Sequence, residues 1–371
     1  MKEIQGRIQA LDRLRGLLVV LMALDHANYF VARAHTPGEY WGGSFPAYPT
    51  SAAFLSRLVT HPAAPGFFFL MGSGAALFAF RRTEEGWKPR RIRGYLLLRG
   101  MLLIAVQLLV VNRAWELTPG GWGITVYVGV LTALGGAMLA AAWMLEVKPL
   151  VLLFTAAGLL IATELLTPSA SRWTDPFNPL LRLLLIPGGT RVLWVNYPIL
   201  PWMGLTLFGL AFGGWLKRDP SAAYHRTLWI GFGALILFVA SRVGNGFGNI
   251  RPRSGGGWIG FLNVVKYPPS LTFVLLTMGF NLIVLRLLLL IREEPSCNRD
   301  PLLVYGSTPL FFYVLHLFLY AGIGRLFAPG GTSLGRMLLY WLLGLAVLYP
   351  LCLGFRELKR RQGSRSVLRL F

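Results

Sequence analysis

The stretch LDRLRGLLVVLMALDHANY, residues 11–29, determines how the rest of the chain is interpreted. Apolar and small residues run from Gly16 to Leu24, as in a segment that crosses a bilayer, and Asp25 and His26 then follow side by side. An ionisable side chain at membrane depth costs about 2.5 kcal/mol or more unless it faces a polar cavity or a partner. Two adjacent ones therefore indicate a cavity inside a helix bundle.

The composition extends this interpretation to the whole chain of 371 residues, of which 55% are hydrophobic and 14% charged. There are too few charged residues to coat a soluble protein of this size, and apolar runs long enough to cross a bilayer recur throughout. We predict an all-α, polytopic helical membrane protein with about ten transmembrane helices in one bundle, forming a single domain over residues 1–371. The expected spans are 16–33, 63–80, 95–112, 123–145, 149–166, 199–216, 227–242, 269–291, 302–325 and 335–355.

The net charge of +21 is explained by topology, so we expect no nucleic-acid partner. About two thirds of the 36 Lys and Arg residues lie in the N-terminal segment, in alternate connections and in the C-terminal tail. This bias predicts that both termini are cytoplasmic. The first apolar segment is expected to be retained because no cleavage site follows it. The two cysteines, Cys297 in a basic loop and Cys352 in an apolar run, predict neither a disulfide framework nor a metal site.

Four cations stand out because they lie on the side of the membrane where cations are disfavoured: Arg242, Arg251, Arg253 and Lys266. They are expected either to meet lipid headgroups or to line the entrance to an outer site for an anionic ligand. Lys266 and Tyr267 also precede Pro-Pro-Ser, which breaks a helix and is expected to form a re-entrant corner over the cavity. In the second span, Gly72 and Gly74 predict close helix packing.

Arg15 and His26 are eleven residues apart, which is about 16 Å and three turns along a helix. They are expected near one face of the helix, in one cavity that opens to the cytoplasm. Asp25 is rotated by about 100° from His26 and is expected to pair with an arginine or to donate a hydrogen bond when protonated. Histidine suits proton transfer near neutral pH. A buried polar cluster that only fixes helix packing is the structural alternative.

Two further histidines have structural alternatives of the same kind. His61 begins the second span, where it either caps the helix or takes part in a site. His316 lies three residues after Tyr313, on the same helix face, so a structural His–Tyr contact is as well supported as an active-site role.

Five segments carry a family resemblance that covers most of the chain. They are RIQALDRLRGLLVVLMALDH (7–26), RLVTHPAAPGFFFLMGSGAALF (57–78), NYPILPWMGLTLFGLAFG (196–213), FLNVVKYPPSLTFVLLTMG (261–279) and YGSTPLFFYVLHLFLY (305–320). In this order they resemble the bacterial branch of the heparan-alpha-glucosaminide N-acetyltransferase family, within a superfamily of transmembrane acyltransferases.

The resemblance implies an enzyme that moves an acetyl or other acyl group across the membrane. The donor is cytoplasmic acetyl-CoA or another acyl-CoA, no metal is needed, and the acceptor is the hydroxyl or amine of a carbohydrate or other small molecule. The implied setting is the bacterial cytoplasmic (inner) membrane, where the enzyme contacts lipid and modifies glycans. O- and N-transfer both remain open, as does the choice between a monomer and a homodimer.

Residue roles follow from the same resemblance. The expected catalytic residues are His26, Asp25 and His61, with His26 as the base or as a transiently acylated group. Arg15, Arg13 and Arg99 are expected to bind the acyl-CoA. The expected acceptor-binding residues are Lys266, Tyr267, His316, Arg113 and Asn196. Lysosomal animal members have an asparagine in place of His26 and a histidine in the following loop, so His61 and then His35 remain alternatives for the base.

Two functions of another class also account for buried His and Asp residues. One is a proton-coupled transporter or flippase of a small solute or a lipid-linked sugar. The other is an inert partner subunit, which leaves the adjacent Asp25 and His26 unexplained. A basic cytoplasmic rim that binds acyl-CoA distinguishes the transferase from both.

Overall fold

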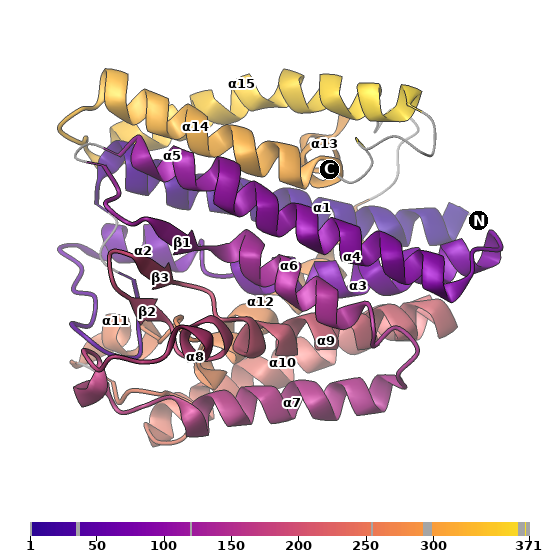
Figure 1. Cartoon of the computed structure of the whole chain (residues 1–371), viewed down its shortest axis with the longest axis horizontal. Coiled ribbons are helices and arrows are strands. Elements are labelled where there is room, and N and C mark those ends of the chain that lie inside the picture. The colour runs from indigo at the N-terminus through magenta and orange to yellow at the C-terminus, as the bar shows by residue number, and fades with distance from the viewer. Residues whose placement is uncertain are drawn as a thin grey trace.

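The computed structural model describes residues 2–34, 38–118, 121–253, 255–291, 299–362 and 368. Long helices lie roughly side by side along the molecule, while the strands and most of the short helices collect at the end opposite the start of the chain (Figure 1). The elements are α1 (Lys2–Ala27), η1 (Asn28–Ala32), α2 (Ser51–Leu58), α3 (Ala63–Glu84), α4 (Pro89–Val106), η2 (Gln107–Val111), α5 (Asn112–Glu116), β1 (Val126–Val128), α6 (Val130–Ala141), α7 (Pro149–Leu166), η3 (Ala170–Arg172), α8 (Pro179–Leu184), β2 (Gly188–Gly189), β3 (Leu193–Val195), α9 (Ile199–Arg218), α10 (Pro220–Gly244), α11 (Gly257–Leu262), α12 (Leu271–Leu288), α13 (Pro301–Ser307), α14 (Pro309–Phe327) and α15 (Leu334–Arg361).

The predicted all-α membrane fold is confirmed. Within the described ranges, nine helices are long and apolar enough to cross a bilayer. The expected span 123–145 is wrong as a continuous helix, because α6 has 12 residues, about 18 Å, and is preceded by a strand. Gly121 and Gly123 take positive φ before that strand, so the chain turns there, and the backbone of β1 pairs with β3 instead.

The expected span 302–325 is also divided, into α13 and α14. Thr308 between them leaves helical geometry, with φ −131° and ψ 42°, and Pro309 follows. A residue before proline is disfavoured in the helical region, which explains the break.

Helices α3 and α9 pack with their backbones almost in contact. A Cβ added at Gly72 would lie 2.0 Å from the Thr206 carbonyl oxygen, and one at Gly209 would lie 1.9 Å from that of Phe69. The close packing expected at Gly72 is therefore confirmed, whereas Gly74 faces open space. Small residues at such contacts are typical of helix pairs in membranes.

The corner between α11 and α12 is fastened to the loop that follows η1. The Lys266 and Tyr267 backbone N–H groups both donate to the Glu39 carbonyl oxygen, at 2.8 and 3.0 Å. Tyr267 in turn accepts from the Trp41 N–H at 2.8 Å. These bonds hold Lys266 and Tyr267 over one end of the bundle, as the Pro-Pro-Ser sequence predicts.

Candidate functional site

Two cavities meet inside the bundle. The first, which we call the histidine pocket, has a volume of about 460 Å³, and the second, the arginine pocket, has about 290 Å³. Both include four side chains that we call the constriction: Met22, Phe67, Val130 and Tyr313. The remaining lining of the histidine pocket includes Asp25, His26, Arg57, Trp115, Trp122, Tyr127, Trp194, Asn196, Lys266 and Tyr267. That of the arginine pocket includes Arg15, Arg99, Lys359, Leu70, Phe78 and Leu103.

Arg15 and His26 lie in different pockets. The expectation that they face one shared cavity is therefore wrong in detail, although both point into the bundle from the same helix. The two pockets have only the four side chains of the constriction in common. The arrangement is a largely aromatic pocket that holds His26 and a basic pocket that adjoins it.

A chain of two hydrogen bonds determines which nitrogen of His26 carries a proton. His316 Nδ1 lies 2.9 Å from the Phe312 carbonyl oxygen, and His316 Nε2 lies 2.7 Å from His26 Nδ1. A carbonyl oxygen only accepts, so His316 Nδ1 donates and its Nε2, in the neutral ring, accepts. His26 therefore donates from Nδ1, and its Nε2 has the lone pair of a base.

Aromatic rings surround His26. The ring centroid of Trp115 is 5.5 Å from that of His26, edge to face, and the ring of His316 is stacked at 4.9 Å. His316 is fully buried and does not line either pocket. The structure therefore places His316 behind His26, and not in contact with a bound acceptor.

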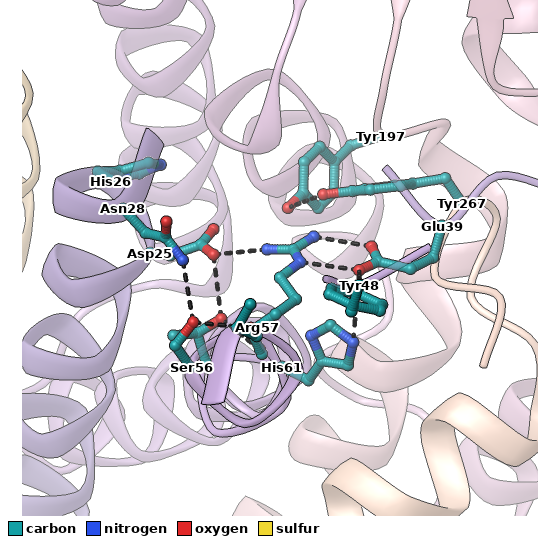
Figure 2. Close-up of polar contacts among 12 residues, drawn as sticks. Asp25, His26, Asn28, Glu39, Tyr48, Ser56, Arg57, His61, Tyr197 and Tyr267 are labelled. Carbon is teal, nitrogen blue, oxygen red and sulfur yellow. Dashed lines mark hydrogen bonds and ion pairs between the residues drawn. The ribbon is translucent and has the colours of Figure 1, made fainter. Parts of the chain in front are cut away.

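An ion triad joins three segments beside the histidine pocket (Figure 2). Arg57 donates from Nη1 to Asp25 at 2.6 Å, and from Nη2 and Nε to the two Glu39 oxygens at 2.8 Å each. The expected pairing of Asp25 with an arginine is observed, and the arginine is Arg57. Asp25 also accepts from Thr60 at 3.1 Å, so its carboxylate is directed away from His26.

Glu39 is the most deeply enclosed member of the triad. It is fully buried, and Tyr48 donates a further hydrogen bond to it at 3.1 Å. Burial alone raises a carboxyl pKa, but the Arg57 guanidinium outweighs it and holds the pKa of Glu39 well below its usual range. Glu39 is therefore ionised at neutral pH and keeps Arg57 in place.

His61 lies on the far side of Glu39 from the pocket. Its Nε2 is 3.7 Å from Glu39 Oε1, its Nδ1 has no hydrogen-bond partner in the described part of the chain, and its ring is tilted against Phe273. His61 lines neither pocket. The third candidate base, His35, is outside the described residues.

The acceptor-binding residues expected from the sequence separate into two groups. Lys266, Tyr267 and Asn196 line the histidine pocket, where Asn196 accepts a hydrogen bond from the Tyr40 hydroxyl. Arg113 instead lies at the surface in an ion pair with Glu116 at 3.0 Å, so the structure does not bring it to the site.

The expected acyl-CoA residues separate in the same way. Arg15 and Arg99 line the arginine pocket. Arg13 is buried, and its Nε lies 2.9 Å from Asp300, the residue that caps α13. The structure adds Lys359 from α15, which the sequence analysis did not single out because the tail is basic throughout.

Three of the four outer cations are not at an entrance, which corrects that expectation. Arg242 is buried and bonded to the carbonyl oxygens of Phe261, Gly260 and Asn263. Arg251 reaches the Tyr40 and Gly42 carbonyl oxygens, and burial lowers the pKa of its guanidinium. Arg253 is exposed and packs over Phe261. Arg242 and Arg251 thus hold loop backbone, and Lys266 is the member of the four that lines the histidine or the arginine pocket.

Arg57 and Glu39 were not singled out from the sequence as site residues. Both lie in the segment 34–62, which the sequence indicates to be a loop, and nothing in their spacing shows that they meet Asp25. One signal was available: an arginine on the side where cations are disfavoured needs an acidic partner or a ligand. Among the described residues there is no group of three His, Cys, Asp or Glu that could hold a metal ion.

Comparison with known proteins agrees with this geometry. A family model described as heparan-alpha-glucosaminide N-acetyltransferase, catalytic, matches residues 7–243. A human protein named heparan-alpha-glucosaminide N-acetyltransferase is 30% identical over 129 residues, which is 35% of this chain and 17% of the human protein. Its mouse counterpart is 29% identical over 130 residues, which is 35% of this chain and 18% of the mouse protein. The match thus spans about a sixth of each relative's length. Because the family model covers well over half of the sequence, the chain belongs to the heparan-alpha-glucosaminide N-acetyltransferase family.

Proposed function

We propose that the protein is a membrane acyltransferase that moves an acetyl or other acyl group from cytoplasmic acyl-CoA to a hydroxyl or amine acceptor, a sugar or similar small molecule, on the other side. The proposed setting is the bacterial inner membrane, with both termini in the cytoplasm and glycans as the molecules modified. The observation that supports this most is the pair of pockets that meet at Met22, Phe67, Val130 and Tyr313. One pocket is basic, the other holds a histidine with a base-type nitrogen, and family membership favours the same activity.

The arginine pocket has the chemistry that acyl-CoA requires. Arg15, Arg99 and Lys359 come from three different helices and supply positive charge for phosphate groups. Leu70, Phe78 and Leu103 supply an apolar wall for the pantetheine chain and the acyl group. A donor bound in this way would direct its thioester toward the constriction.

The histidine pocket supplies the proton transfer. The acceptor oxygen or nitrogen attacks the thioester carbonyl carbon while its proton moves to His26 Nε2. The tetrahedral intermediate then collapses, the carbon–sulfur bond breaks, and the CoA thiolate takes that proton. Tyr313 lines both pockets, and we assign its hydroxyl the role of stabilising the negative oxygen. In the other route, His26 Nε2 attacks first and is transiently acylated.

The test is acyl transfer by the purified protein in proteoliposomes with radiolabelled acetyl-CoA and glucosamine. We expect His26→Ala to lower the transfer rate by about 10²–10⁴-fold, as for loss of a general base, and to leave acetyl-CoA binding intact. The matched control is His225→Ala, an exposed histidine on α10 that bonds to Trp229. If His61→Ala abolished transfer while His26→Ala kept it, the base would be His61. Glucosamine uptake without acetylation would instead support a transporter.

A further inference from the structure

Lys266 has an unusual position in the histidine pocket. It is 4% exposed, it lines the cavity, and its ammonium packs over the Tyr267 ring at 5.2 Å. Among the described residues no hydrogen bond or ion pair reaches this ammonium. A buried charge without a direct partner costs free energy, so it indicates a partner that arrives with the ligand.

The acidic groups nearby are already occupied. Both Glu39 oxygens accept hydrogen bonds from Arg57, and one accepts a further bond from Tyr48. Asp25 is held by Arg57 and Thr60. Lys266 affects Glu39 electrostatically but lies beyond ion-pairing distance of it. Lys266 is therefore available to an anion in the pocket.

Lys266 and His26 lie at opposite ends of the pocket wall. The Asp25–Arg57–Glu39 triad spans the distance between them, because Asp25 is next to His26 and the Glu39 carbonyl oxygen accepts from the Lys266 N–H. Figure 2 shows His26 beside the Asp25 end of the triad, and Tyr267 above its Glu39 end with the hydroxyl directed toward Tyr197. A ligand that reaches both groups must carry its anionic group at some distance from its reacting atom.

The lining of the histidine pocket is also rich in aromatic rings. Trp115 packs against His26 and against Tyr127, with ring centroids 5.9 Å apart, and Tyr40 packs against Tyr267 at 5.0 Å. Flat rings facing polar groups suit a sugar, whose C–H faces stack on rings while its hydroxyl groups bond to the polar side.

We infer that the acceptor is a sugar with an anionic oxygen group, a carboxylate or a phosphate, which Lys266 binds at the end of the pocket opposite His26. This inference rests on the proposed acyltransferase function and adds the substrate class. A charge-assisted hydrogen bond to a buried ammonium is worth about 10–100-fold in affinity. The anionic group thus determines which sugar binds and places its hydroxyl or amine at the base.

The test compares two matched pairs of acceptors: methyl glucoside with methyl glucuronide, and glucosamine with glucosamine 6-phosphate. We expect the native protein to prefer the anionic member of at least one pair by about 10-fold or more in kcat/KM. The pair that shows the preference distinguishes a carboxylate from a phosphate. Equal kcat/KM values within both pairs would overturn the inference, whatever the variants do.

Variants then assign the preference to Lys266. Lys266→Met is expected to abolish the preference, so that kcat/KM for the anionic acceptor falls to that of its neutral partner measured on the same variant. Lys266→Arg retains the charge and is expected to keep a preference. Arg253→Met is the control for charge lost outside the pockets. A preference that persists in Lys266→Met refutes the assignment, and Lys266 then only balances the charge of Glu39.

Binding without acyl-CoA separates this inference from the proposed function. Titration with methyl glucuronide and glucosamine 6-phosphate is followed by tryptophan fluorescence, since Trp194 and Trp115 line the pocket. Saturable binding that Lys266→Met weakens about 10-fold or more supports the anion site even if no acyl transfer is detected. Anionic sugars that bind no better than their neutral partners argue against it even if transfer is robust.

Discussion

At the scale of single residues, the proposed chemistry depends on the pair of histidines, His26 and His316. A neutral imidazole is a useful base only if the correct nitrogen carries the lone pair and points at the acceptor. The Phe312 carbonyl oxygen determines which nitrogen of His26 carries the lone pair. It fixes the tautomer of His316 through one hydrogen bond, and His316 fixes that of His26 through the next. His316 thus acts through His26, as a positioning residue.

We predict that His316→Phe lowers kcat about 10- to 100-fold and leaves the KM for acetyl-CoA nearly unchanged, since the arginine pocket does not include His316. Phenylalanine fills the space but cannot accept the His26 Nδ1 proton. His316→Gln restores an acceptor oxygen and is expected to recover part of the rate. Steady-state kinetics of both variants measure this. Equal loss in both, with a raised KM, would show that His316 only supports packing.

The sequence alone indicates one part of the site, Asp25 and His26, but not the part formed by Arg57 and Glu39. Asp25 and His26 are conspicuous because they interrupt an apolar run that has no need of charge. Arg57 and Glu39 lie in a polar loop where charge is ordinary, and only the fold brings them to Asp25. Arg13 and Arg113 show the converse, since their residue type and position suited a site but ion pairs with Asp300 and Glu116 hold them elsewhere.

At the scale of elements, the ion triad connects α1, the loop around Glu39 and α2. The same loop carries the backbone bonds that hold Lys266 and Tyr267. The triad therefore supports both ends of the histidine pocket through one buried guanidinium. A buried ion pair contributes little net stability compared with apolar packing, but breaking one leaves an uncompensated charge.

We predict that Glu39→Gln destabilises the protein by about 3 kcal/mol, the lower end of the range for a broken buried pair, because Asp25 still holds Arg57. Thermal unfolding in detergent measures it. The control is Glu116→Gln, which removes half of an exposed pair with Arg113 and is expected to cost at most about 1 kcal/mol. A Glu39→Gln protein as stable as this control would contradict a supporting role for the triad.

The sign of the pH dependence follows from the depressed pKa of Glu39. Its unfolded-state pKa is about 4.3, so its contribution to stability is fully present above that pH. The contribution declines as pH falls from there toward the lower folded-state pKa. The contribution of Glu39 to stability should thus not change with pH between pH 5 and pH 7, and the loss of stability below about pH 4 should be smaller in Glu39→Gln than in the native protein.

Apolar length predicts the long helices well but not their interruptions. The segment 123–145 is apolar enough for a span, yet its first part pairs with β3, a partner about 65 residues away that no local pattern reveals. The division at Thr308 has a local cause in Pro309, and the signal was present in the sequence. Interruptions that arise from distant pairing are the part of the fold that periodicity does not predict.

At the scale of the whole molecule, the two pockets lie in series along the bundle. Arg15 precedes His26 along α1, and the strands and short helices cover the end beyond His26 (Figure 1). Lys359 near the end of α15 lines the same pocket as Arg15, so the C-terminal part of α15 lies close to the N-terminal part of α1. In the proposed orientation this end of the bundle faces the cytoplasm, as the positive-inside rule predicts.

In the proposed reaction, the constriction is the place where the acyl group and the acceptor meet. Val130, at the start of α6, is its smallest apolar member and comes from an element separate from those of Met22, Phe67 and Tyr313. A larger side chain at position 130 narrows the constriction without removing a polar group from either pocket. The volume of this one residue should therefore control transfer and leave the two binding sites in place.

We predict that transfer falls steadily through Val130→Leu, Val130→Phe and Val130→Trp, to below about a hundredth of the native rate in the last. Acetyl-CoA binding to the arginine pocket, measured by equilibrium titration, should change by less than about threefold. Val126→Trp is the control, since Val126 is 38% exposed, lies four residues earlier and lines neither pocket. If Val130→Trp transferred at the native rate, the acyl group would have to reach the acceptor without passing the constriction, and the two pockets would not form one path.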